Sequence, residues 1–374
     1  MDVVSVVTPK DLARFIRLPH SIYAGDPLWV APLDSDERAR LTPGKNPFFE
    51  HAEAAYFLAR DGARDVGRIA VSIDQNHDST HGEKQAAFGF FEAESAAAAA
   101  ELLQATERWG SARGAEVLRG PLNFTTNDDC GLLIHGFEHP PTLLMPYNKP
   151  SYPAWMDAAG MTKAKDLYAF RISVAHPLPD QVVRVAEKVR AHHGIVMRPL
   201  NMKRFGEELQ RVKEVYNSAW EKNWGFVPMT DHEIDHMAAQ LKPAVVPDLV
   251  LFAEIEGKPI GFLLALPDVN QALRPLRGKL FPFGLIRLLW SLPRVRDGRL
   301  MALGVREGYR RRGIEALLIH ELHRVMNAKG YVNLEVGWTL EDNDLVNRLI
   351  ETVHGEHYKT YRIYERRLTP PPAG

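Results

Sequence analysis

The stretch at residues 303–318, LGVREGYRRRGIEALL, joins an apolar strand to a helix through a short basic turn. Residues 299–305 have the character of a strand, and residues 314–328 have the spacing of an amphipathic helix, which Gly330 ends. The first amides of a helix have no partners inside it and carry the positive end of its dipole. The sequence therefore predicts an anion site at this turn, suited to a diphosphate.

Three consecutive arginines and a glycine strengthen this prediction. Arg310, Arg311 and Arg312 supply charge for further phosphates. Gly313 removes a side chain where a ligand's phosphates would approach. A nucleotide-linked diphosphate, such as that of CoA, suits this arrangement. The alternative interpretation is that RRRG is a solvated basic loop.

The turn resembles the acyl-CoA-binding motif of the GNAT N-acetyltransferase superfamily: Arg or Gln, two residues, Gly, one residue, then Gly or Ala. Arg310 and Gly313 match, and the resemblance implies that Leu303 and Val305 offer main-chain groups to the pantetheine of acetyl-CoA or another acyl-CoA. It implies that the diphosphate is held by the amides of Arg311, Arg312, Gly313, Ile314, Glu315 and Ala316. The sequence departs from the motif at Glu315, whose carboxylate repels a diphosphate unless it points away.

The same resemblance extends beyond this helix. The family has a strand, then an asparagine before a short helix with a tyrosine that protonates the departing thiolate in many relatives. Asn343 stands at the asparagine position and is implied to bind the cofactor, whereas Ile350 occupies the tyrosine position. Tyr358 and Tyr361 on the last predicted strand are the candidate acids, with simple packing as the alternative.

Acyl transfer to an amine also needs a base. Glu335, on the predicted strand 331–338, is our candidate, acting directly or through water. We expect this strand to part from its neighbour there and expose the thioester, whose carbonyl oxygen an N–H of the strand ending at Val305 would hold. The alternative for Glu335 is a salt bridge to a nearby arginine.

The chain of 374 residues repeats this order of elements in weaker form before HPLP at 176–179, which is typical of a linker. We therefore expect an N-terminal domain over 1–175, a linker and helix over 176–194, and a C-terminal acyl-CoA-binding domain over 195–374. The resemblance implies an α/β (α+β) fold of two tandem GNAT-like domains, each a mixed, mostly antiparallel central sheet flanked by helices. The chain also resembles tandem-domain bacterial proteins of the YghO-like kind, through RGPLNFTTND at 119–128 and KTYRIYE at 359–365.

The N-terminal copy has EAES at 92–95 where a basic turn would stand, so we expect no cofactor there and a role in shaping the acceptor site. Its polar, glycine-bounded segment 119–131 is typical of a binding loop. The candidate acceptor-binding residues are Asn123, Thr126, Asn127 and Asp128. The alternative is a loop whose side chains bond their own backbone.

Two further segments need an interpretation. His232-Glu233-Ile234-Asp235-His236 spells HExxH, the pattern of a zinc hydrolase, but Asp235 separates the ligands and no third ligand is recognisable. We expect no metal. Residues 274–299 mix arginines and prolines with bulky apolar residues, including Leu280, Phe281, Phe283 and Trp290. This segment is a lid over a greasy ligand, an interfacial helix, or a surface packed on another domain or subunit.

Composition narrows the class of protein. Lys and Arg number 46 against 47 Asp and Glu, so no overall field favours nucleic acid. The single Cys130 excludes an internal disulfide framework. With neither a secretory signal nor a membrane span, we expect a cytoplasmic protein that can form a homodimer. The predicted function is acyl-CoA-dependent N-acyl transfer to a small-molecule or peptide amine. The alternatives are a non-catalytic acyl-CoA-binding regulator, favoured by Glu315 and Ile350, and, remotely, a zinc hydrolase.

Overall fold

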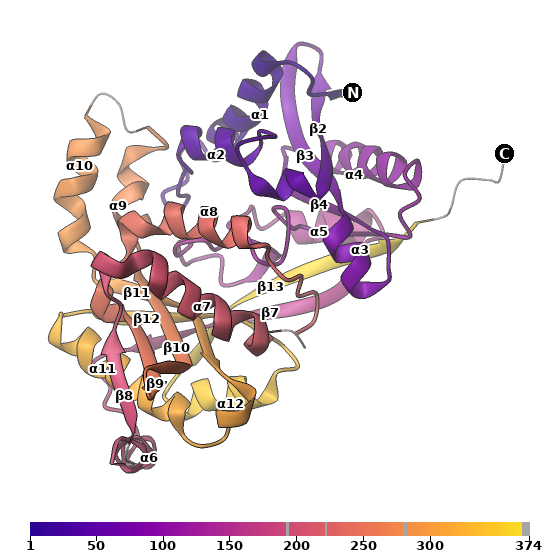
Figure 1. Cartoon of the computed structure of the whole chain (residues 1–374). Helices are drawn as coiled ribbons and strands as arrows, with labels where there is room; N and C mark the ends of the chain where they lie inside the picture. The colour runs from indigo at the N-terminus through magenta and orange to yellow at the C-terminus, as the bar shows by residue number, and fades with distance from the viewer. Residues whose placement is uncertain (192–193, 221–222, 280–282, 369–374) are drawn as a thin grey trace. The chain divides into compact units, whose positions relative to one another are not determined.

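The computed structural model describes residues 1–191, 194–220, 223–279 and 283–368. The chain forms two compact units, whose helices and strands are labelled in Figure 1. The first contains Met1–Leu167, Ala272–Trp290 and Lys359–Gly374, and the second contains Tyr168–Gln271 and Ser291–Tyr358. Strands β7 (Thr162–Ser173) and β13 (Glu356–Arg367) each have residues in both units. The end of the chain thus belongs with the first unit, and the boundary differs from a single division near residue 176.

The first unit has the strand order β1-β2-β3-β4-β5-β13, and β6 also pairs with β13. Pairing is antiparallel from β1 to β4 and parallel between β4 and β5. Its strands are β1 (Asp2–Ser5), β2 (Ala52–Asp61), β3 (Arg64–Asp74), β4 (Gln85–Ala93), β5 (Val117–Gly120) and β6 (Leu132–His135). Its helices are α1 (Pro9–Ile22), α2 (Asp34–Arg40), α3 (Gln75–His81), α4 (Ala96–Ser111) and α5 (Tyr152–Ala158).

The second unit has the order β7-β12-β11-β10-β9-β8. Pairing is antiparallel from β8 to β11 and parallel between β11 and β12. Its strands are β8 (Ile195–Pro199), β9 (Val250–Ile255), β10 (Lys258–Pro267), β11 (Asp297–Val305) and β12 (Asn333–Leu340). Its helices are α6 (Asp180–Arg190), α7 (Phe205–Trp220), α8 (Asp231–Leu241), α11 (Ile314–Ala328) and α12 (Asp344–Thr352). Two short helices, α9 (Asn270–Leu273) and α10 (Gly284–Ser291), follow β10.

The two units repeat one plan. In each, an antiparallel run of four strands is followed by a helix that crosses to a parallel fifth strand: α4 in the first unit and α11 in the second. Short 3-10 turns connect some of these elements, such as Glu307–Tyr309 before α11. The predicted tandem α/β fold is therefore confirmed.

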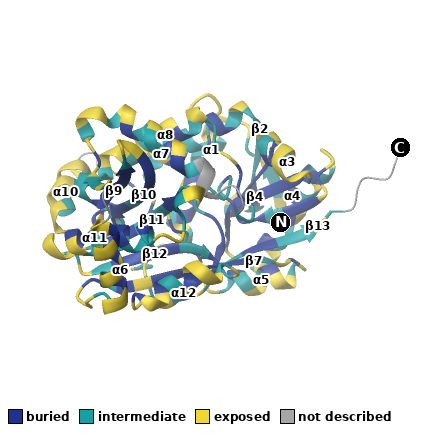
Figure 2. Cartoon of the chain, turned by 60° about the horizontal axis from the view of Figure 1, so that its bottom comes forward, coloured by how far each residue is buried: buried dark blue, intermediate teal, exposed yellow. Residues whose placement is uncertain are grey.

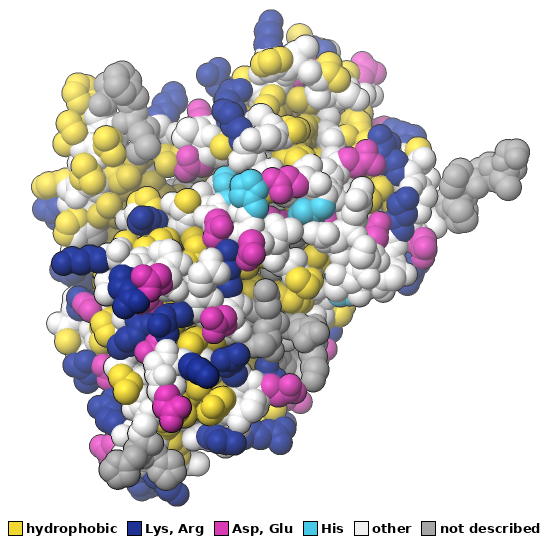
Figure 3. Space-filling view, viewed as in Figure 1, with side chains coloured by type: hydrophobic (Ala, Val, Ile, Leu, Met, Phe, Trp, Pro, Cys, Tyr) yellow, Lys and Arg dark blue, Asp and Glu magenta, His cyan; other side chains and the backbone are white. Residues whose placement is uncertain are grey.

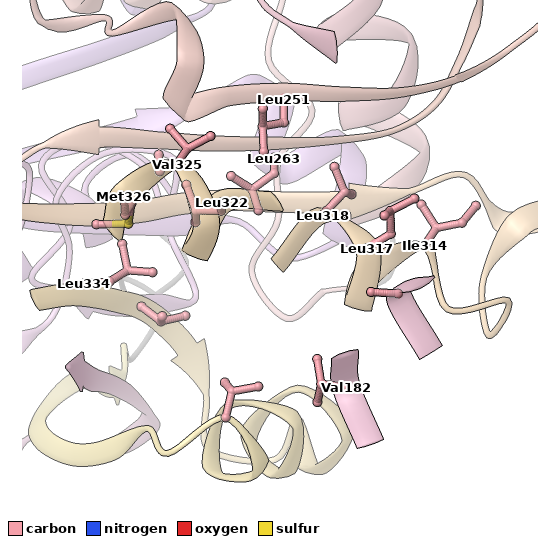
Figure 4. Close-up of a cluster of buried hydrophobic side chains, with 14 of the residues drawn as sticks. Val182, Leu251, Leu263, Ile314, Leu317, Leu318, Leu322, Val325, Met326 and Leu334 are labelled. Carbon is pink, nitrogen blue, oxygen red and sulfur yellow. The ribbon is translucent and has the colours of Figure 1, made fainter. Parts of the chain in front are cut away.

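The core of the second unit lies between the apolar side of α11 and the sheet (Figure 4). Leu317, Leu318 and Leu322 of α11 are buried together with Leu251 of β9 and Leu263 of β10. In both units the sheet strands are mostly buried, whereas the helices expose their outer sides (Figure 2). Among the described residues, no helix has both the length and the apolar character required to cross a bilayer.

Candidate functional site

The helix that follows the basic turn begins with unpartnered amides. Gly313 is the N-cap of α11, with a left-handed φ of 81°. Within the described parts of the chain, no side chain accepts a hydrogen bond from the amides of Ile314, Glu315 or Ala316. Glu315 therefore does not cap this terminus, and the donors that the motif requires remain available to an anion.

Gly313 is also needed for the packing of α6. A Cβ atom at this position would lie 2.7 Å from Cγ1 of Val185 and 2.9 Å from Cγ2 of Val189. The space that the missing side chain of Gly313 leaves, which was predicted to admit phosphates, is thus occupied by α6. The left-handed backbone is a second, independent reason for glycine here.

The three arginines differ in their contacts. Arg310 donates from Nε to the carbonyl of Val305 at 3.1 Å, so it ties the turn back to the end of β11. The Arg312 guanidinium lies 5.4 Å from the centroid of the Tyr309 ring. Arg311 and Arg312 are both exposed. The charge available to a phosphate therefore comes mainly from these two residues.

Strands β11 and β12 part next to this turn. Their registered pairs run from Asp297↔Asn333 to Leu300↔Val336 and end there, while β11 stays paired with β10 as far as Val305. Leu303 and Val305 lie on the parted section, Leu303 half-buried and Val305 buried. The first β12 carbonyl beyond the paired stretch, that of Gly337, accepts hydrogen bonds from the Arg299 guanidinium at 3.0 and 3.3 Å.

Glu335 lies at this point of divergence. Its side chain is buried, at 3% exposure, and its carboxylate accepts a hydrogen bond from the Tyr358 hydroxyl. Nε of Arg299, which faces Glu335 across the strand pair, is 3.9 Å from the other carboxylate oxygen. The hydrogen bond with Tyr358 agrees with Glu335 as a base, and the proximity of Arg299 agrees with a salt bridge.

The two candidate tyrosines fall in different places. Tyr358 belongs to the second unit, with Glu335, whereas Tyr361 belongs to the first. Tyr361 is fully buried and pairs with Leu133 of β6. Of the two, Tyr358 is the one placed against the candidate base.

Helix α12 shows what replaces the family's usual tyrosine. Asn343 is its N-cap and accepts a hydrogen bond from the amide of Val346 at 3.4 Å, while Ile350 is buried in the core. Sequence reasoning missed Asn347, whose buried amide accepts from Thr339 Oγ1 at 2.7 Å and donates to the carbonyl of Leu340 at 3.0 Å. Asn347 thus fixes the corner between β12 and α12. A polar residue at the inward position of an otherwise apolar helical face was the available signal.

The corresponding helix of the first unit begins differently. Ser95 caps α4, and its hydroxyl accepts from the amide of Ala98 at 3.2 Å. Just before it, the buried Glu92 accepts hydrogen bonds from the hydroxyls of Tyr23 and Tyr152, each at 2.8 Å. Burial raises the pKa of Glu92 to about 7. A buried acid and a serine cap therefore stand where the second unit has arginines and open amides.

The opening between β4 and β5 is filled by the chain itself. Registered pairs between these strands end at Ala87↔Arg119. Beyond them, the amide of Leu122 donates to the carbonyl of Phe88 at 2.7 Å, and Asn123 Oδ1 accepts from the amide of Phe90 at 2.6 Å. A Cβ atom on Gly89 would lie only 1.9 Å from the carbonyl oxygen of Leu122. Residues 121–124 thus occupy the place that lies between parted strands in the second unit.

The polar loop is satisfied by its own groups and by Arg40 of α2. Asn123 Nδ2 donates to Asp129 at 2.6 Å, and Asp128 Oδ2 accepts from the amides of Phe124 and Thr125 at 3.2 and 3.3 Å. Arg40 bonds the carbonyl of Asn123 and the carboxylate of Asp129. Thr126 and Asn127 lie half-buried in the same turn. These contacts favour the self-capped interpretation for Asn123 and Asp128.

HExxH forms the start of α8. Glu233 is part of a capping box with Thr230, in which Thr230 N donates to Glu233 at 2.8 Å and Glu233 N donates to Thr230 Oγ1 at 3.2 Å. Nε2 of His236 lies 2.9 Å from the side-chain nitrogen Nε2 of Gln240. Asp235 forms an ion pair with Lys213 at 2.9 Å. In the described ranges, no group of three His, Cys, Asp or Glu residues is arranged to hold a metal ion. Helix capping thus explains Glu233.

A hollow of about 690 Å³ lies between β8 and α7, and no predicted site residue lines it. Arg198 within it is paired with Glu208 at 2.9 Å and with Glu254 at 2.7 Å. The charge of Arg198 is thus already compensated within the protein.

The chain is similar to known proteins along nearly its whole length. Residues 209–355 match the acetyltransferase (GNAT) family. A bacterial ceramide synthase of Caulobacter vibrioides (strain NA1000 / CB15N) is 38% identical over 376 residues, covering 98% of each chain. Protein YghO of Escherichia coli (strain K12) is 37% identical over 374 residues, covering 98% of this chain and 95% of the relative.

Solved structures agree on the fold. A tandem GNAT protein from the clavulanic acid biosynthesis pathway superposes with a TM-score of 0.58 over 99% of both chains, at 12% identity. An N-acetyltransferase of the same family from Sphaerobacter thermophilus gives 0.53 over 98% of this chain and 96% of that one, at 16% identity. With its repeated strand-helix plan, its open helix terminus and these relatives, the chain belongs to the acetyltransferase (GNAT) family as a tandem of two such folds.

Proposed function

We propose that this protein transfers an acyl group from acyl-CoA to the nitrogen of an amine. The observation that carries the proposal is the hydrogen bond from Tyr358 to Glu335 at the point where β11 and β12 part. It joins an acid and a base beside the strand that, in this family, pairs with pantetheine. The open amides of Ile314, Glu315 and Ala316, with Arg311 and Arg312, would hold the diphosphate.

Bound acyl-CoA supplies an activated acyl group, and two residues of the protein transfer protons. Glu335 accepts one from the attacking amine, directly or through a water. Tyr358 gives one to the departing sulfur, because no hydroxyl stands at Ile350. The proton on Glu335 then passes along the hydrogen bond to Tyr358, which restores both residues. One amide bond forms, one thioester bond breaks, and the proton count balances.

We propose a long-chain amino alcohol as the acceptor. The support is the relative named bacterial ceramide synthase, since a ceramide is the amide of a fatty acid and a long-chain amino base. We further propose that only the second unit binds acyl-CoA. Residues 121–124 and the Ser95 cap fill the corresponding places in the first unit.

The decisive experiment measures thiol release from acetyl-CoA and from long-chain acyl-CoA, against long-chain amino alcohols, small soluble amines and peptides. We expect release with a long-chain amino alcohol, and a loss of about tenfold or more in Glu335→Gln at unchanged acyl-CoA affinity. Unchanged turnover in Glu335→Gln would remove Glu335 from the mechanism.

The second candidate is a non-catalytic acyl-CoA-binding regulator. The burial of Ile350 at the family's usual acid position favours it. Tight acyl-CoA binding without thiol release against every class of amine would support the regulator over the enzyme.

A further inference from the structure

An insertion after β10 distinguishes the second repeat from the first. Between β3 and β4 the first repeat has only α3 and a short turn, at residues 75–84, whereas β10 and β11 are separated by residues 268–296. Within 270–296 the sequence contains no Asp or Glu. The same span contains six cationic residues: Arg274, Arg277, Lys279, Arg287, Arg294 and Arg296.

The first part of this insertion is fixed to the first unit. Ala272 and Leu276 are buried, and the carbonyl of Gly278, a residue with φ 78°, accepts a hydrogen bond from the amide of Asp34 at 3.3 Å. A Cβ atom on Gly278 would lie 2.7 Å from the carbonyl oxygen of Pro32. The backbone is therefore held tightly at its base before α10 begins. Leu280 and Phe281 lie outside the described residues.

The part beyond this anchor exposes large apolar side chains. Five occur within eight residues, and the other large exposed hydrophobics of the described chain are spread over distant segments. They are Phe283 (75% exposed), Leu285 (52%), Ile286 (67%), Leu289 (60%) and Trp290 (67%). Figure 3 shows hydrophobic side chains gathered over α10. A contiguous apolar surface of this kind marks an interaction site.

We infer that α10 docks on the surface of an anionic phospholipid bilayer. A short helix with Trp, Phe and Leu side chains inserts at the level of the headgroups, and neighbouring cations attract anionic lipids. Eight residues are far too few to span the hydrocarbon core. The helix therefore lies in the interface.

Charge favours a membrane over a second copy of this chain. A twofold interface through α10 would bring the same cations of both copies together, with no acidic residue in 270–296 to neutralise them. An anionic bilayer neutralises the cations and covers the apolar side chains at once. This docking goes beyond the proposed acyl transfer, and it is measured without turnover.

The test is cosedimentation of the full chain with vesicles of phosphatidylcholine alone or mixed with phosphatidylglycerol. We expect binding to the mixed vesicles that weakens with added salt and is at least about tenfold weaker on phosphatidylcholine alone. Ile286→Asp/Leu289→Asp should abolish binding, and Lys279→Gln/Arg287→Gln should reduce it about tenfold.

Matched controls alter exposed residues elsewhere. Val7→Asp/Val196→Asp removes two exposed apolar side chains, and Lys10→Gln/Lys258→Gln removes two exposed cations; both should bind vesicles as the parent does. Thermal unfolding verifies that each variant is folded, and acyl-CoA affinity should be unchanged in all. The inference is overturned if the parent does not bind mixed vesicles or if the control variants lose binding equally. It is also overturned if the parent forms a dimer without lipid and Ile286→Asp/Leu289→Asp dissociates that dimer.

Discussion

The hydroxyl of Tyr358 donates a hydrogen bond to the carboxylate of Glu335, linking β13 to β12. Nε of Arg299, on the neighbouring strand β11, lies 3.9 Å from the other carboxylate oxygen of Glu335. Neither tyrosine nor glutamate stands at the position where the family usually has its acid. The chemistry proposed for this protein therefore depends on two residues acting as one unit.

Such a unit predicts non-additive loss. Tyr358→Phe and Glu335→Gln should each lower turnover about tenfold or more, and the double variant should be no worse than the worse single one. Thiol release at saturating acyl-CoA measures this. Tyr361→Phe, which changes a residue buried in the first unit, should retain turnover; additive losses in the double variant would show that the two residues act separately.

Gly313 predicts a stability effect that a second substitution repairs. Gly313→Ala places a side chain at a left-handed φ of 81° and against Val185, and we expect a loss of about 1–3 kcal/mol in the free energy of unfolding. Val185→Ala should recover the part due to the clash with Val185, but neither the part due to Val189 nor the part due to the backbone. Urea unfolding of the two single variants and the double variant separates these contributions; full recovery would assign the whole cost to packing.

Glu315 predicts a gain in ligand affinity. It is the second residue of α11, so its carboxylate opposes the diphosphate that the amides of Ile314 to Ala316 would hold. Glu315→Gln should tighten acyl-CoA binding several-fold at low salt, with a smaller gain at high salt because ions screen the repulsion. Titration calorimetry at two salt concentrations tests this. Arg312→Gln is the opposite control and should weaken binding.

Glu92 predicts a change in stability with pH. Burial raises the pKa of its carboxyl from 4.5 to about 7 in the folded protein, so the folded state binds a proton that the unfolded state releases between these values. Stability contributed by the neutral acid is therefore present below pH 4.5 and is lost as the pH rises through 7. Glu92→Gln keeps the neutral form, so its advantage over the parent should grow from pH 5 to pH 8, to at most about 3 kcal/mol. Thermal unfolding across this range measures it; a constant difference would mean that Glu92 does not titrate there.

Local patterns predicted some elements well and long-range pairing poorly. The helix predicted at 314–328 is α11 to the residue, because its apolar spacing and the glycines at 313 and 330 are local signals. The last strand was assigned whole to the C-terminal domain, yet its residues from Lys359 onward belong with the first unit. No periodicity within β13 encodes which strands flank it.

The candidate site divides in the same way. Glu335 was proposed as the base because of its predicted strand. Its contact with Tyr358 rather than Tyr361 depends on how β13 is divided between the units. The polar loop drew attention through its composition, and only the fold showed that Asn123 bonds the amide of Phe90. Asn347 was overlooked because its partners, Thr339 and Leu340, are fixed by a corner that sequence spacing does not describe.

The loop at 121–124 has an energetic consequence for the two repeats. These residues are part of the chain, so the stability that their contacts with β4 give the first unit does not depend on a ligand concentration. Among its described residues, the second unit has no such segment between β11 and β12. Under the proposed function, mass action would tie its stability to the concentration of free acyl-CoA. A fall in acyl-CoA concentration would then lower the stability of the second unit and leave that of the first unit unchanged.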